Sequence, residues 1–163
     1  MQLCVQCACR GTACCQARDI FVTTADILRI YDISGAVDFY EYRRPLSADY
    51  LDQNDDPDWN MYTVQLDGSR RVLKQGPMWK CIFLAENGCR LPLAIRPLVC
   101  RLHPVEYTEQ RITGLASECP SELLPDGVGL LENLCMNLAE AEKWRLQLYA
   151  ELKHDWTTQP KAA

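Results

Sequence analysis

Cysteine is the residue type in this chain whose number and spacing could support chemistry. Ten cysteines occur among 163 residues, and half of them lie within the first fifteen. Cysteine thiolates are ligands that zinc ions and iron–sulfur clusters share. The pattern therefore predicts that thiols far apart in the sequence converge on one or two metal centres, around which the fold is assembled. The candidate metal ligands are Cys4, Cys7, Cys9, Cys14, Cys15, Cys81, Cys89, Cys100 and Cys119.

The adjacent residues Cys14 and Cys15 restrict how metal could be bound. Neighbouring side chains usually diverge, so both can bind one ion only if the backbone is distorted. The pair indicates either one ligand and one packed thiol, or two ligands that serve different metal atoms. The second alternative favours a cluster or a two-metal site over a single zinc ion. Cys135, by contrast, lies on an apolar helical stripe and is expected to be a core thiol.

Composition narrows the class of protein. Hydrophobic residues make up 48% of the chain, so it can bury a core without the cross-links of a disulfide scaffold. No signal-peptide pattern and no membrane-spanning window is visible. We therefore expect a cytoplasmic protein without a membrane partner, where clustered cysteines hold metal. The formal net charge of −5 argues against a nucleic-acid partner, because phosphate binding needs clustered Lys and Arg.

The elements expected to position the first cysteines are short. A hydroxyl cap at Thr23 or Thr24 and a stop at Gly35 frame a helix with an apolar face. A second short helix is expected at 37–42. Residues 47–60 are polar and acidic, and they are expected to form a solvated loop.

Turn dipeptides predict short hairpins in the middle of the chain. Asp67–Gly68 and Asn87–Gly88 are typical of tight reversals. Cys81 and Cys89 flank the second turn, which therefore resembles a knuckle that presents two sulfurs to one ion. The expected paired strands are 61–66 with 71–73, and 105–107 with 111–113.

The C-terminal region is predicted to be a long amphipathic helix. From about Asp126 onward, apolar residues recur on one side of a helical wheel, interrupted by Glu142 and Arg145. A short helix interrupted by prolines is expected at 91–99. The predicted fold is α+β: a small, cysteine-rich single domain with short β-hairpins, short N-terminal helices and the long C-terminal helix around a metal centre. The domain would cover 1–156, followed by a tail at 157–163.

Three motifs in a fixed order resemble a known family. The first is residues 9–15 (CRGTACC), and the second combines 81–84 (CIFL) with 87–89 (NGC). The third is residues 96–104 (RPLVCRLHP). Over about residues 4–119 the chain resembles the prokaryotic cysteine-cluster family named CxxCxxCC, which is described as a zinc- or iron-chelating domain.

The resemblance implies which residues belong to the site. They are Cys14, Cys15, Cys81, Cys89 and Cys100, with one or more of Cys4, Cys7 and Cys9. The N-terminal spacing departs from a plain CxxCxxCC, which leaves the first ligand open. His103 stands where the family carries an aromatic residue, so it is either an extra ligand or a substitute ring.

Arg96 and Arg101 flank Cys100 and are candidate cofactor-binding residues. They could neutralise thiolates and donate hydrogen bonds to sulfur. They could equally pair with acids on the long helix or cap backbone carbonyls. Both interpretations stay open at this point.

These features favour a metal-binding protein without catalytic activity of its own. An iron–sulfur cluster is expected, because the thiols outnumber the four ligands of one tetrahedral zinc; zinc is the alternative. Such a protein could transfer electrons, handle metal or sense redox state. A structural zinc in a module that binds a protein partner is a second alternative. A cluster-bearing enzyme, such as a protein-modifying transferase, is a third, although no glycine-rich cofactor loop or nucleophile elbow occurs.

Overall fold

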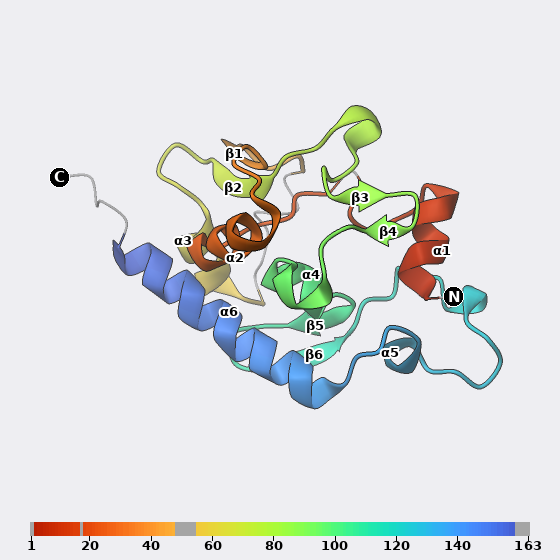
Figure 1. The fold of residues 1–163 in the computed structure, drawn as a ribbon. Coiled ribbons are helices and arrows are strands. Elements are labelled where there is room, and N and C mark those ends of the chain that lie inside the picture. The colour runs from red at the N-terminus through yellow and green to blue at the C-terminus, as the bar shows by residue number, and fades with distance from the viewer. Residues whose placement is uncertain (1, 17, 48–54, 159–163) are drawn as a thin grey trace.

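Figure 1 shows the chain as a computed structural model, which describes residues 2–16, 18–47 and 55–158. The helices are α1 (Leu3–Arg10), α2 (Thr24–Ser34), α3 (Pro57–Thr63), α4 (Leu98–Leu102), α5 (Leu130–Asn133) and α6 (Leu138–Thr158). The antiparallel strand pairs are β1 (Tyr40–Arg43) with β2 (Arg70–Leu73), β3 (Leu84–Ala85) with β4 (Gly88–Cys89), and β5 (Val105–Tyr107) with β6 (Ile112–Leu115). Single 3-10 turns occupy Pro77–Trp79, Leu93–Ile95 and Ser121–Leu123. This combination of helices with separate strand pairs confirms the predicted α+β class.

Helix α2 begins and ends where the sequence indicates. The Asp26 backbone N–H donates to the Thr23 hydroxyl at 2.9 Å, and the Thr23 N–H donates to the Asp26 carboxylate at 3.1 Å. Two backbone donors that a helix start leaves unpaired are thus satisfied reciprocally. Gly35 ends the helix in the left-handed conformation, with φ of 65°.

Replacing Thr23 by alanine is expected to lower the free energy of unfolding by about 1–2 kcal/mol, the usual cost of a lost N-cap. Thr23 is fully buried, and its hydroxyl also donates to Glu151 on α6 at 2.5 Å. Thr23→Ser keeps the hydroxyl and is the matched control in urea unfolding. Equal losses in the two variants would assign the effect to the methyl group rather than to the cap.

The second predicted helix, at 37–42, is wrong. These residues lead into β1, which pairs with β2 so that Tyr40 lies opposite Leu73. Phe39 is 1% exposed and its ring lies 5.7 Å from that of Phe83. Strand pairing and burial of this ring, both long-range contacts, decided the conformation.

The predicted strand at 61–66 is also wrong, because its first half, 61–63, belongs to helix α3. Pro57 occupies the first turn of α3, where its missing N–H costs nothing. Trp59 and Tyr62, three residues apart, are buried on one face of this helix. The turn at Gly68 is correctly predicted, since Gln65 N–H donates to the Ser69 carbonyl at 2.8 Å, but the strand that pairs with β2 is β1. The loop predicted at 47–60 is wrong from Pro57 onward, where α3 begins. Residues 48–54 of that loop lie outside the described residues.

The hairpin predicted at 105–113 is confirmed by β5 and β6. The helix expected at 91–99 is instead a 3-10 turn at Leu93–Ile95, followed by α4 from Leu98. Pro97 immediately precedes α4, so the helix starts after the proline rather than before it.

The C-terminal helix is broken, which corrects two predictions. α5 and α6 are separate helices, and Cys135 lies between them with a φ of 55°. Cys135 is exposed, so it is not a core thiol. A left-handed residue cannot continue an α-helix, and this kink takes the thiol off the apolar stripe. α6 continues through Thr158, two residues beyond the expected domain boundary, and 159–163 lie outside the described residues.

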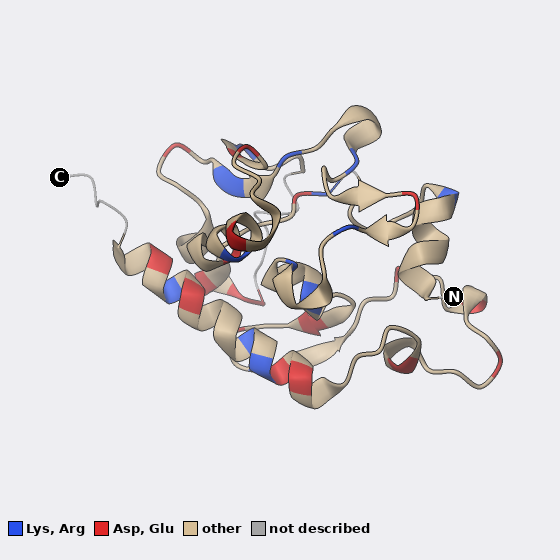
Figure 2. Ribbon diagram, in the orientation of Figure 1, with Lys and Arg blue, Asp and Glu red and all other residues tan. Residues whose placement is uncertain are grey.

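Helix α6 lies along one side of the molecule, where it packs against α2, α3 and α4 (Figure 1). Leu148 and Leu152 are fully buried against Leu98 and Leu102 of α4. Charged residues of both signs occur along the length of α6 (Figure 2). One of them, Arg145, is 3% exposed; it ion-pairs with Glu142 and donates to the Thr108 carbonyl, which explains why a charge interrupts the apolar stripe. No helix within the described residues has the length and apolarity needed to cross a bilayer.

Candidate metal centre

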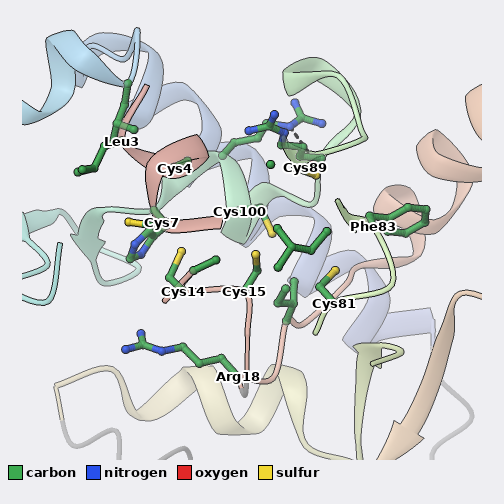
Figure 3. A pocket seen from close by; sticks show the side chains of 18 of the residues that line it. Leu3, Cys4, Cys7, Cys14, Cys15, Arg18, Cys81, Phe83, Cys89 and Cys100 are labelled. Atoms are coloured by element: carbon green, nitrogen blue, oxygen red, sulfur yellow. Dashed lines mark hydrogen bonds between the residues drawn. The ribbon is translucent and has the colours of Figure 1, made fainter. Parts of the chain in front are cut away.

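A cavity of about 330 Å³ is lined by residues of α1 and the β3–β4 hairpin, among others (Figure 3). Figure 1 shows that these two elements lie side by side at one end of the molecule. Segments from both halves of the chain line the cavity. The cysteines that line it are Cys4, Cys7, Cys14, Cys15, Cys81, Cys89, Cys100 and Cys119. Eight of the nine predicted ligands are thus brought around one space.

Helix α1 positions the first two of these thiols. Cys4 and Cys7 are three residues apart on α1, so they share one face of the helix. Gly11 ends α1 with a φ of 70°, and the Thr12 N–H donates to the Cys7 carbonyl at 3.0 Å. This left-handed turn, which glycine adopts at little cost, directs the chain back so that Cys14 and Cys15 also line the cavity.

The β3–β4 hairpin and the residues just before it position two further thiols, those of Cys81 and Cys89. Gly88 adopts a φ of 97° at the turn, and Cys89 pairs with Leu84 across the hairpin. The Cys81 N–H donates to the Cys15 carbonyl at 3.1 Å. This backbone bond ties the central turn directly to the N-terminal cysteine segment.

The last two thiols come from α4 and from the segment after β6. Cys100 lies in the middle of α4, whose first residue, Leu98, donates its N–H to the buried Asp26 carboxylate at 3.1 Å. Cys119 Sγ lies 3.6 Å from the His103 Nε2 atom. His103 therefore faces a cavity thiol. Burial and the positive charge of Arg18 lower the pKa of His103, which favours the neutral imidazole.

Cys9 and Cys135 do not line the cavity. Cys9 is exposed, and its thiol donates to the Glu86 carbonyl at 3.4 Å. Cys135 accepts a 3.5 Å contact from the Gln2 amide and is exposed. Of the three α1 cysteines that the sequence left as alternative ligands, Cys4 and Cys7 line the cavity and Cys9 does not.

Arg96 and Arg101 both line the cavity, and both cap carbonyls with their Nε groups. Arg96 donates to Leu91 at 3.0 Å, and Arg101 donates to Arg96 at 2.7 Å. Burial lowers the pKa of Arg101, as does the nearby positive charge of Arg29. The two arginines thus hold the loop before α4, and their role toward a cofactor stays a prediction.

The cavity disfavours thiolates unless a cation is present. Burial raises the pKa of Cys81 and of Cys119 to about 11 and that of Cys15 to about 12, and neighbouring thiols add to each shift. Burial raises the pKa of Cys100 well above the usual range of a thiol. Only a positive charge can offset so many anions in one partly desolvated space. The electrostatics therefore favour either neutral thiols or a bound metal.

The donor set suits an all-sulfur metal centre. All ten cysteines are free thiols, and eight of them surround the cavity with one imidazole. Within the described residues, no three Cys, His, Asp or Glu side chains are already arranged to hold one ion. A cysteine side chain reaches a new position by rotation about one bond, so ligation requires the thiols to turn inward. The chemistry of the donors fits thiolate-bound zinc or iron.

One positioning residue was missed by the sequence interpretation. The Thr23–Asp26 spacing predicts a helix cap, but it does not predict that Asp26 also bonds Leu98, 72 residues away. The sequence signals only the local bond between Thr23 and Asp26, because the bond from Leu98 forms only when α4 packs beside α2. Asp26 therefore links the helix cap to the element that carries Cys100.

Comparison with known proteins agrees with this donor chemistry. No curated protein and no solved structure matches the chain. A family model does match: CxxCxxCC, described as "Putative zinc- or iron-chelating domain", covers residues 3–120. This range contains every cysteine that lines the cavity. The chain therefore belongs to the CxxCxxCC family.

Proposed function

We propose that this protein binds an iron–sulfur cluster through the thiolates of the cavity. The observation that carries the proposal is that eight cysteines, from segments spread between residues 4 and 119, surround one space. Free thiols collected from distant segments have no packing advantage over apolar residues of similar size. A shared ligand supplies the reason for gathering them.

The size of the cavity favours a cluster over a lone ion. The cavity has a volume of about 330 Å³, and eight thiols line it, twice the number that one tetrahedral zinc ion binds. A zinc ion bound by four sulfurs at about 2.3 Å fills far less space and uses only four thiols. A cluster brings inorganic sulfide as well as iron, and so accounts for more of the volume. Two zinc ions are the alternative, because each tetrahedral zinc binds four thiolates and eight thiols line the cavity.

The proposed role is electron transfer, metal handling or redox sensing rather than catalysis. Several cavity thiols, among them Cys14 and Cys89, are only partly buried, so the site reaches the surface. Surface access suits exchange of electrons or metal with a partner. The proposed setting is reducing and cytoplasmic, where cysteine thiols stay available to bind metal.

Anaerobic purification followed by elemental analysis tests the proposal. We expect iron and acid-labile sulfide in stoichiometric amounts, with visible absorbance, and we expect metal removal by a chelator to lower the melting temperature. Cys135→Ser is the control and should keep its full metal content, since Cys135 is exposed and outside the cavity. A colourless protein with stoichiometric zinc would support the alternative metal. Absence of both metals after anaerobic reconstitution would refute metal binding.

A further inference from the structure

We propose that the cavity contains two neighbouring four-cysteine centres, and that the adjacent residues Cys14 and Cys15 serve different ones. This inference rests on the proposed function and adds how the thiols are divided. The central group is Cys15, Cys81, Cys89 and Cys100. The amino-terminal group is Cys4, Cys7, Cys14 and Cys119.

The central group shares one apolar environment. All four thiols pack in the cluster of buried residues that contains Phe39, Leu73 and Phe83. The backbone bond from Cys81 to the Cys15 carbonyl, at 3.1 Å, fixes two of the segments side by side. In Figure 3 the sulfurs of Cys15 and Cys100 lie close together, between that of Cys14 and that of Cys81.

The amino-terminal group lies at the α1 side. Cys7 and Cys119 pack in a different apolar cluster, with Leu3 and Ala13. Cys15 packs against both clusters, so the two groups adjoin at Cys14 and Cys15. Cys4 shares the helix face of Cys7. In Figure 3 the sulfur of Cys14 lies toward Cys7, whereas that of Cys15 lies toward Cys100. The two neighbouring cysteines therefore belong to different sides of the cavity.

Four thiols on each side match the ligand number of a tetrahedral zinc and of a cysteine-bound iron–sulfur cluster. The division also satisfies the geometric constraint on adjacent residues, because neither centre needs both Cys14 and Cys15. His103, next to Cys119, can donate an N–H to the thiolate of the amino-terminal group.

Metal stoichiometry in single and double variants tests the division. Zinc chloride is used as the probe in anaerobic reconstitution, and zinc per folded chain is measured after excess metal is removed. Wild type should bind two zinc ions. Cys15→Ser and Cys14→Ser should each retain one. The within-group double variant Cys15→Ser/Cys89→Ser should also retain one, whereas the cross-group double variant Cys15→Ser/Cys119→Ser should retain none.

Far-UV circular dichroism checks that each variant is folded, and Cys89→Ser or Cys119→Ser replaces a single variant that is not. One zinc ion in wild type, or loss of all zinc in a single variant, would mean one shared centre and would overturn the division while leaving metal binding intact. Equal retention in the within-group and cross-group doubles would overturn it too. No zinc in wild type would also overturn the division, and the proposed function itself would be refuted only if iron and sulfide were absent too.

Discussion

Replacing Cys100 by serine is expected to remove metal from the central group and to lower the free energy of unfolding by more than about 4 kcal/mol, the range typical of a lost metal site. Cys100 lies in α4, and its thiol packs in the same apolar cluster as those of Cys15, Cys81 and Cys89. Binding free energy that joins separate segments is also folding free energy. A serine hydroxyl cannot replace the thiolate, and it adds an unpaired polar group to an apolar cluster.

Metal content and thermal melting are the two measurements, with Cys135→Ser as the matched control. That variant exchanges the same atoms at an exposed position, so its stability should change by no more than about 0.5 kcal/mol. If Cys100→Ser kept the metal content and melting temperature of wild type, Cys100 would not be a ligand.

Replacing Asp26 by alanine is the second change with a large expected effect, a loss of about 3–5 kcal/mol in the free energy of unfolding. The Asp26 carboxylate is fully buried and pairs with Arg29 at 2.5 Å. It also accepts the N–H groups of Thr23 and Leu98. Removing it leaves a partly buried guanidinium and two backbone donors without this acceptor, and α4 loses its attachment to α2.

Urea unfolding measures this loss, and Asp32→Ala is the control because Asp32 is exposed on the same helix. The control should stay within about 0.5 kcal/mol of wild type. Asp26→Asn keeps acceptors but removes the charge, so a smaller loss than in alanine would separate the hydrogen bonds from the ion pair. Metal content should fall in Asp26→Ala, since the helix carrying Cys100 is no longer held. Stability equal to that of Asp32→Ala would contradict the assigned role.

Signals that act over a few residues were readable from the sequence. The cap at Thr23, the stop at Gly35 and the turns at Gly68 and Gly88 all occur where local chemistry predicts them. The tight turn between Cys81 and Cys89 was readable in the same way, whereas the presentation of both sulfurs to one ion stays a prediction.

Elements that depend on distant partners were not readable in this way. β1 is a strand because β2 pairs with it, and α3 is a helix because it buries Trp59 and Tyr62. Cys135 fits the helical spacing of the apolar residues around it in the sequence, yet it is exposed because the chain kinks there, between α5 and α6. In each case a tertiary contact outweighed a local preference of well under 1 kcal/mol per residue.

By itself the sequence indicated a thiol-rich donor set, since ten cysteines stand against two histidines and five of the ten fall within the first fifteen residues. The tertiary structure decided which cysteines meet: it gathered eight around the cavity, left Cys9 and Cys135 outside, and set Cys14 and Cys15 toward different sides. Residue type fixes what a side chain can bind, but only the packing of α1, the β3–β4 hairpin and α4 against one another fixes which side chains share a space.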